Sequence, residues 1–236
     1  MRIAVFFTPP RDHPLTNAAA DWLGRDAFTD EIRPRGEVPG FDSDEIAALT
    51  ADPRRYGFHA TLKPPFRIAA GHNLDDIRAA LAGFCRTQPA FTIPALELTA
   101  LGPFFALTAG RATADVNELA AAVVRDLDPF RAPATEEEIA RRRPESLSER
   151  QRDYLREWGY PYVFDEFQFH MTLTGRVPVA RRAAMAEVLR RRFAPFIGRP
   201  LAIDALALFC EPLPPSDFFV DSHAALVPVK QAMAGT

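Results

Sequence analysis

The chain contains one five-residue phrase twice, as Phe58-His59-Ala60-Thr61-Leu62 and as Phe169-His170-Met171-Thr172-Leu173. Each phrase has the order apolar, His, apolar, Thr, apolar. On a β-strand, successive side chains point to opposite faces of the sheet. The apolar residues of each phrase should therefore face a core, while its His and Thr face outward together. Two such strands side by side would present two imidazoles and two hydroxyls to one cleft.

This set of side chains suits acid–base chemistry on a phosphate ester. Hydrolysis of a phosphate ester needs one proton taken from water and another given to the departing oxygen, on opposite sides of phosphorus. Two imidazoles on facing strands can reach both sides, and an unperturbed pKa near ~6.5 makes both charge states accessible at neutral pH. We predict that His59 and His170 are the catalytic acid and base, and that the Thr61 and Thr172 hydroxyls bind the phosphate. Which histidine has which role stays open.

Other interpretations of the two phrases also stay open. His59 and His170 could be hydrogen-bonded structural residues on half-buried strands. They could belong to a non-catalytic module that binds a phosphate or an RNA end. A metal enzyme using both as ligands is a further hypothesis, but no carboxylate or third His shares their frame, and no Cys/His cluster has zinc spacing. We therefore expect no metal and no cofactor.

Composition limits the partners and the location. The chain has 236 residues, 47% of them apolar and 25% charged, with a net charge of −3. A protein that binds long nucleic acid through its backbone usually has a basic surplus, so a small phosphate ester is the expected partner. RNA ends remain possible, DNA is not expected, and the oligomeric state is not indicated. No apolar stretch approaches the ~20 residues of a membrane helix, and Cys85 and Cys210 stand alone, so we expect a cytoplasmic protein.

The similarity between the two halves extends beyond the phrases. The two histidines are 111 positions apart, and residues 93–98 correspond to 203–208 at an offset of 110. We predict a His-bearing strand over 56–63, ended by Pro64-Pro65, and a second over 167–175. Each is followed by a helix and two strands. The halves, about 56–108 and 167–229, predict one bilobal α+β domain over 1–236, with two pseudo-symmetric lobes whose antiparallel sheets meet along the His strands around a central cleft.

Two regions have no counterpart in this repeat. The segment 131–162 is either an insertion that covers the cleft or structural filler, and the sequence does not separate these. The tail, residues 231–236, is expected to be frayed.

Five more side chains are secondary candidates for substrate contacts. Lys63 shares strand parity with His59, and Arg176 with His170, so each could point into the cleft and bind a phosphate, or be a solvated cation at a strand end. Tyr56, Tyr162 and Arg131 could contact a base or ribose, although core packing or loop anchoring would also explain them.

The paired phrases resemble those of the 2H phosphoesterase superfamily, whose members include 2′,5′ RNA ligase-like proteins and cyclic nucleotide phosphodiesterases. Longer stretches are similar to one branch of it, the phosphonate-metabolism proteins encoded beside phosphonate-degradation genes. These stretches are 56–66, 159–176, 6–10 and 22–26.

The resemblance implies a bilobal α+β fold with antiparallel sheets on either side of a water-filled cleft. It also implies that His59 and His170 act as acid and base, and that Thr61 and Thr172 hold the phosphate. The activity it implies is a metal-independent phosphoesterase that hydrolyses a cyclic phosphodiester or a 2′,5′-type ester of a small nucleotide or phosphoribosyl substrate. RNA end processing or 2′,5′ ligation is the alternative within the same superfamily.

Overall fold

The computed structural model describes residues 1–110 and 114–228, so the tail at 231–236 lies outside the described residues. Its strands are β1 (Arg2–Phe7), β2 (Ala60–Phe66), β3 (Phe91–Ile93), β4 (Leu96–Leu101), β5 (Phe104–Ala109), β6 (His170–Thr172), β7 (Leu201–Ile203), β8 (Ala205–Glu211) and β9 (Phe219–Ala225). Its helices are α1 (Pro14–Leu23), α2 (Ser43–Leu49), α3 (Ala51–Tyr56), α4 (Leu74–Cys85), α5 (Ala114–Asp126), α6 (Glu136–Ala140), α7 (Glu149–Trp158) and α8 (Arg182–Phe193). Short 3₁₀ turns include η1 (Asp128–Phe130), η3 (Phe164–Glu166) and η4 (Val179–Arg181).

Seven strands form one sheet in the order β4-β5-β6-β2-β1-β8-β9, and β3 pairs with β7 in a separate two-stranded sheet. Every pairing between these strands is antiparallel. The predicted α+β class with antiparallel sheets is therefore confirmed. The strands of the two halves do meet along β2 and β6, through the pair Ala60–Met171, but they form one continuous sheet rather than two.

The sheet order reveals the symmetry of the repeat. Reading outward from the β2–β6 junction, β2 corresponds to β6, β1 to β5 and β8 to β4, while β9 is an additional edge strand. The pair Ala60–Met171 joins residues that are equivalent in the repeat, and so does the pair Thr92–Ala202 between β3 and β7. Residues paired with their own equivalents lie on a two-fold axis, so a pseudo-two-fold axis passes through both pairs.

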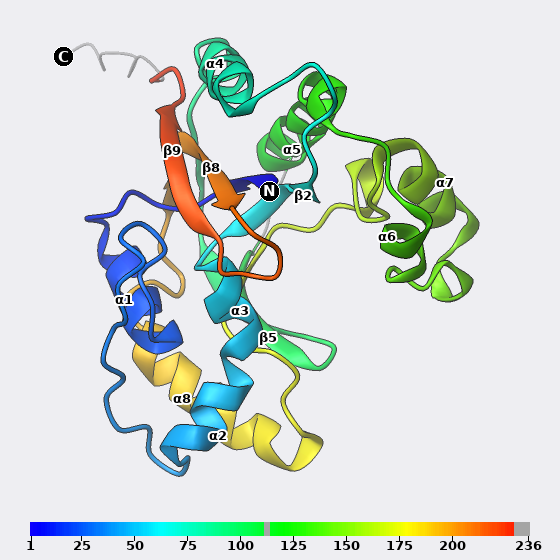
Figure 1. Cartoon of the computed structure of the whole chain (residues 1–236). Helices are drawn as coiled ribbons and strands as arrows, with labels where there is room; N and C mark the ends of the chain where they lie inside the picture. The colour runs from blue at the N-terminus through cyan, green and yellow to red at the C-terminus, as the bar shows by residue number, and fades with distance from the viewer. Residues whose placement is uncertain (111–113, 229–236) are drawn as a thin grey trace, which may run out of the picture.

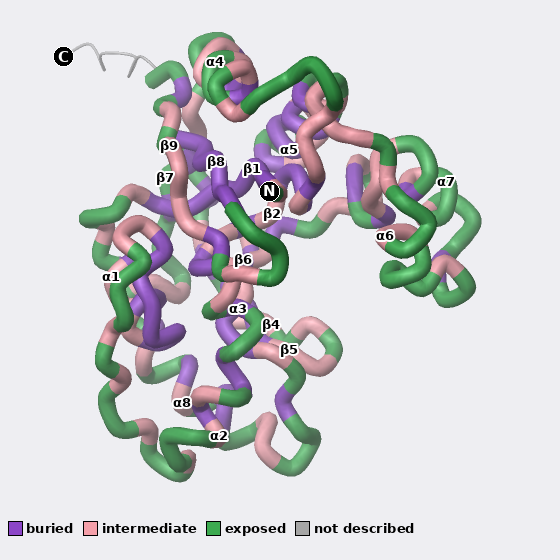
Figure 2. Tube along the Cα trace, viewed as in Figure 1, coloured by how far each residue is buried: buried purple, intermediate pink, exposed green. Residues whose placement is uncertain are grey.

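One face of the large sheet is covered by helices. Residues of α1, α4, α5 and α8 share one apolar core with the inward-facing residues of the central strands, among them Val5, Leu62, Met171 and Leu208. In Figure 1, α1 lies beside α8 and α4 lies near α5, whereas α6 and α7 stand apart from the sheet. Figure 2 shows the strands largely buried and much of the α6–α7 region exposed. The opposite face carries a smaller buried cluster that includes Phe6, Phe209 and Phe218, and the polar residues of the two phrases lie on the same face as this cluster.

The first His strand differs from its predicted bounds. Tyr56 ends helix α3, and β2 begins only at Ala60 and continues through the two prolines to Phe66. Proline is tolerated in a strand where its missing N–H is not needed by a neighbour. β6 reaches β2 only at Ala60, and the pairing of β2 with β1 is irregular between Lys63 and Phe66, so the prolines interrupt no regular ladder.

The second His strand is shorter than the predicted 167–175. Only His170–Thr172 pairs as β6, because the chain arrives from the turn η3 and leaves the ladder directly afterwards. The amides of Leu173 and Thr174 both bond to the carbonyl of Phe105. The indole N–H of Trp22 in α1 donates to the carbonyl of Leu173 at 2.7 Å, which ties this exit to the helical layer.

Met171 lies on the symmetry axis and is fully buried, so shortening it should leave a cavity between sheet and helices. We expect Met171→Ala to lower the free energy of unfolding by about 2–5 kcal/mol in urea titrations. Val179→Ala, at a side chain 78% exposed, serves as the control and should change it by less than about 0.5 kcal/mol. Equal effects of the two substitutions would contradict this description of the core.

Candidate active site

His170 lies on β6 and His59 directly precedes the neighbouring strand β2, and their side chains lie on the same face of the sheet. The antiparallel pairing of Ala60 with Met171 places His59 across from Thr172, and Thr61 across from His170. All four side chains alternate with the buried pair, so they point to the face opposite the main helical layer, where Phe6 and Tyr56 also lie. Diagonal neighbours on one face of an antiparallel pair have Cβ atoms about 7–8 Å apart. The two imidazoles are therefore arranged diagonally around the pseudo-two-fold axis, with a hydroxyl beside each.

Each imidazole is held by the same backbone contact. Nδ1 of His59 lies 2.8 Å from the carbonyl oxygen of Gly57, and Nδ1 of His170 lies 2.8 Å from that of Gln168. A carbonyl oxygen can only accept, so Nδ1 must carry the proton in both rings. In the neutral ring, Nε2 is then the nitrogen with the free lone pair. Two side chains far apart in the sequence are thus fixed in the same tautomer.

The Gly57 contact needs glycine. Its φ of +76° lies in the region that other residues avoid, and a Cβ at this position would approach Cβ of Ala27 to 2.5 Å. This backbone turn carries the chain from α3 into β2 and presents the carbonyl to His59. Gly57 was not singled out from the sequence, although it directly precedes the first phrase and its position corresponds to that of Gln168.

The surroundings of the two histidines differ at one equivalent position. The register places Phe6 of β1 beside Thr61 and Ala106 of β5 beside Thr172, so Phe6 and Ala106 occupy positions related by the pseudo-two-fold axis of the sheet. The Phe6 ring stacks on His59 with centroids 3.8 Å apart and an interplanar angle of 20°. Ala106 has no ring that could stack on His170. The His170 ring instead lies near Phe104, with ring centroids 6.0 Å apart.

Burial of His59, to which the rings of Phe6, Tyr56 and Phe209 contribute, acts on its protonation. Burial lowers the pKa of His59 to about 4, the hydrogen bond to the Gly57 carbonyl opposes that shift, and the charge of His170 adds to it. His59 is therefore neutral at neutral pH. With Nδ1–H donated to the carbonyl, Nε2 accepts from the Thr61 hydroxyl at 3.1 Å. The influence of His170 also indicates that the two rings interact electrostatically.

Lys63 does not point into this site. Val5 pairs with Lys63 while Phe6 pairs with Thr61, so a β-bulge between these pairs breaks the strict alternation on which the prediction depended. Lys63 is 1% exposed, and its Nζ bonds to the carbonyl of Val124 at 3.1 Å and to Asp128 at 2.8 Å. Its role is to join β2 to the end of α5. The prediction that strand parity points Lys63 into the same cleft as His59 is therefore wrong.

The other secondary candidates are spread out. Arg131 forms a two-point ion pair with Asp128 and donates to the carbonyl of Glu157. These contacts correspond to loop anchoring, one of the alternatives to a base or ribose contact. Arg176 is exposed, beyond the end of β6. Tyr162 is 47% exposed. Tyr56 is the secondary candidate that lies beside the His pair, since its ring is 6.0 Å from that of His59 and stacks on Phe218 at 5.0 Å.

Other residues near the site were not singled out from the sequence. Thr108 is the register partner of His170 on β5, and its hydroxyl lies 2.7 Å from that of Thr99. Phe6 could have been found only through pairing with β1, which lies more than 50 positions away from the first phrase. Among the described residues, no group of three or more His, Cys, Asp or Glu side chains is placed to hold a metal ion. No helix in that part of the chain could cross a membrane.

The chain belongs to the family described as "Protein of unknown function (DUF1045)", which it matches over residues 61–219. It is also similar to two proteins named ribose 1,5-bisphosphate phosphokinase PhnN. The one from Janthinobacterium sp. (strain Marseille) is 38% identical over 221 residues, which is 92% of this chain and 49% of that protein. The one from Laribacter hongkongensis (strain HLHK9) is 35% identical over 216 residues, 90% of this chain and 48% of that protein. The chain thus spans about half the length of the curated relatives it matches.

Solved structures with a similar arrangement include TT0787 of Thermus thermophilus, with a TM-score of 0.48 and 16% identity over 96% of this chain and 98% of that one. E. coli LigT complexed with 3′-AMP has a TM-score of 0.44 and 13% identity over 95% of this chain and 97% of that one.

The stacked Phe6 ring provides a test of the site's electrostatics. We expect ¹⁵N NMR of the imidazoles to show Nδ1 protonated in both histidines, with His59 titrating near pH 4. Phe6→Ala should raise the pKa of His59 toward its ordinary value of about 6.5, because water then reaches the ring. Ala106→Gly, at the equivalent position beside His170, is the matched control and should leave the His59 titration near pH 4. A His59 pKa near its ordinary value of about 6.5 in the unsubstituted protein would contradict this description.

Proposed function

We propose that the chain is a phosphoesterase that opens a small cyclic phosphodiester by acid–base catalysis, without a metal ion. The observation that carries the proposal is the symmetric pair of imidazoles. His59 and His170 have the same tautomer, set by the same backbone contact, on one face of the sheet. A purely structural role for both would not require two rings of matching orientation around an axis, each with a hydroxyl opposite.

The asymmetry around the pair supports separate roles. A neutral His59 can accept a proton at Nε2, so His59 is the base that activates water, and His170 is the acid that protonates the departing oxygen. The new bond forms between the water oxygen and phosphorus, the ring P–O bond breaks, and that oxygen leaves as a hydroxyl. Thr61 and Thr172 donate to the equatorial phosphate oxygens as charge develops on them. Thr61 would exchange its bond to His59 for one to the phosphate.

The relatives' name suggests a particular substrate. A ribose 5-phosphate with a cyclic phosphate across O1 and O2 gives ribose 1,5-bisphosphate when water breaks the P–O2 bond. Ribose 1,5-bisphosphate is the compound after which the PhnN relatives are named. This chain matches about half the length of each of those relatives. We therefore propose a phosphoribosyl cyclic phosphate as the substrate, in phosphonate metabolism. Hydrolysis would then supply a phosphokinase reaction with its substrate.

Loss of either imidazole should remove most of the activity. We expect His59→Ala and His170→Ala each to lower kcat by about 10²-fold or more, measured by ³¹P NMR of cyclic phosphate opening. Turnover by the parent protein should survive EDTA. His223→Ala is the control, since that imidazole contacts the Thr8 carbonyl, outside the pair. Activity lost to EDTA and restored by a divalent metal would refute the two-histidine scheme.

The pH profile should reflect the low pKa of His59. The base must be neutral, so kcat/KM should fall as pH drops through about 4, where His59 becomes protonated. The profile should also fall at the alkaline side, where the acid loses its proton, giving a bell shape. Phe6→Ala should move the acid limb to higher pH. An acid limb near the ordinary imidazole pKa of about 6.5 in the parent protein would argue against His59 as the base.

A further inference from the structure

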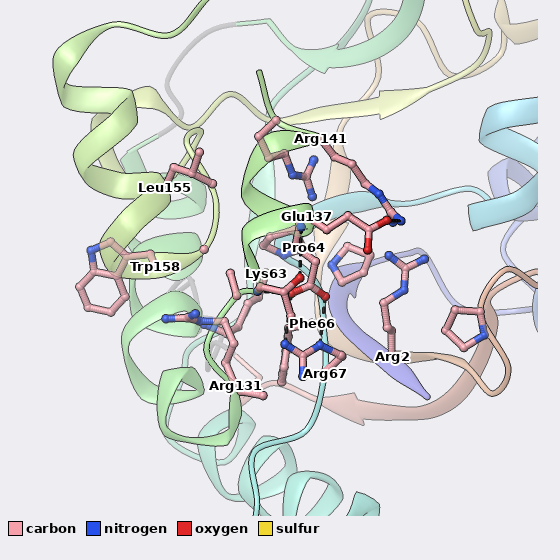
Figure 3. Close-up of a pocket in the computed structure, with 18 of the residues that line it drawn as sticks. Arg2, Lys63, Pro64, Phe66, Arg67, Arg131, Glu137, Arg141, Leu155 and Trp158 are labelled. Atoms are coloured by element: carbon pink, nitrogen blue, oxygen red, sulfur yellow. Dashed lines mark hydrogen bonds and ion pairs between the residues drawn. The ribbon is translucent and has the colours of Figure 1, made fainter. Parts of the chain in front are cut away.

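A cavity of about 730 Å³ lies between the large sheet and the segment that has no counterpart in the repeat. Its lining comes from the ends of β1 and β2 on one side and from α6 and α7 on the other (Figure 3). Neither catalytic candidate lines it, but Tyr56 does, and its ring lies 6.0 Å from that of His59. Arg2, which also lines it, shares a face of β1 with Phe6, roughly 13 Å along the strand. The cavity therefore begins one side chain away from the His pair.

The lining of this cavity is cationic. It contains seven Arg or Lys side chains, against the carboxylates of Glu137 and Glu138. The chain as a whole has a net charge of −3, so its cations are concentrated at this place. Figure 3 shows Arg2 on the side of the sheet, Arg131 on the side of α7, and Arg67 between them.

Nearby carboxylates do not neutralise all of this charge. Arg2 and Arg55 share one carboxylate, that of Glu211, whose side chain is fully buried behind them. Asp128 is likewise shared by two cations of the lining, Lys63 and Arg131. Each shared carboxylate leaves one positive charge in excess.

The remaining cations come from the strand end and from the segment around α6. Arg67 and Arg141 are each paired with one glutamate of α6. Arg142 lies over the ring of Tyr160, 4.9 Å from its centroid, and within the described part of the chain it has no carboxylate at ion-pair distance. The cavity thus has room for an anion and a surplus of positive charge to bind it.

We propose that this cavity binds a second phosphate of the substrate, a monoester, while the cyclic phosphate lies between His59 and His170. The inference rests on the proposed function and specifies its substrate class, a small sugar with two phosphate groups. Guanidinium groups suit phosphate because they donate in pairs to its oxygens. A volume of about 730 Å³ is in the range of sites for small ligands.

A small ligand fits this place better than an RNA strand. Leu155 and Trp158 of α7 line the side opposite the sheet. A site for several nucleotides would need a cationic path that continues beyond the cavity, together with aromatic platforms for the bases. The segment 131–162 is then a wall of the substrate site, which makes it more than structural filler.

The experiment compares two matched substrates, ribose 1,2-cyclic phosphate with and without a 5-phosphate. The parent protein should prefer the 5-phosphorylated form in kcat/KM by about tenfold or more. In the double variant Arg2→Gln/Arg142→Gln this preference should fall to within about threefold. Arg2→Gln leaves Glu211 paired with Arg55, and Arg142 is exposed, so the fold should persist. Arg191→Gln, which removes a surface charge on α8, should keep the preference of the parent.

A binding measurement separates this inference from the proposed function. Calorimetric titration of His59→Ala protein with ribose 5-phosphate should show binding, and the two arginine substitutions should weaken it about tenfold or more. If neither cyclic phosphate is hydrolysed but this binding is found, the proposed function fails and the anion site stands. An equal preference for both substrates in the parent, or unchanged ribose 5-phosphate binding in the double variant, would overturn the anion site. The anion site would also be overturned if the parent bound single-stranded RNA more tightly than ribose 5-phosphate and the Arg2→Gln/Arg142→Gln variant lost that RNA binding.

Discussion

The pairing of Ala60 with Met171 is the contact on which the rest of the structure depends. It joins the two halves of the chain into one sheet and lies on the axis that relates them. Because the strands are antiparallel there, each histidine faces the threonine of the other phrase. A shift of either strand by one residue would turn its His and Thr toward the helices. The buried apolar residues of both phrases oppose such a shift, since they would have to leave the core.

Symmetry of the backbone does not make the two halves of the site alike. The equivalent positions beside the histidines are occupied by Phe6 and Ala106, and only the phenylalanine stacks on its neighbour. Burial lowers the pKa of His59, and the Phe6 ring is one of the groups that bury it, while both histidines keep the same backbone contact. Separate acid and base roles can arise in this way from one duplicated frame. The unpaired segment between the halves adds the second asymmetry, a cationic wall on one side of the axis.

The repeated phrase was enough to predict the α+β class, the meeting of the two His strands and the outward direction of their polar side chains. It could not predict the β-bulge that turns Lys63 toward α5, because a bulge depends on the pairing with β1 and not on the strand's own sequence. The phrase also could not predict that β2 continues through Pro64 and Pro65. The prolines fit there because β6 is short and pairs with β2 only at Ala60, so it needs no N–H from them. Phe6 contacts His59, and Arg2 shares the Glu211 carboxylate with Arg55. Both contacts join segments far apart in the chain, so they are seen only in the folded structure.

The central claim is that two distant imidazoles act on one phosphate. Its most direct test is titration of the protein with inorganic phosphate while the ¹⁵N resonances of both Nε2 atoms are followed, in parent and Arg2→Gln/Arg142→Gln protein. Both resonances should shift along one curve with the same Kd, and the Nδ1 signals should remain protonated. Different Kd values for the two rings, or a response from only one of them, would show that the histidines do not share an anion.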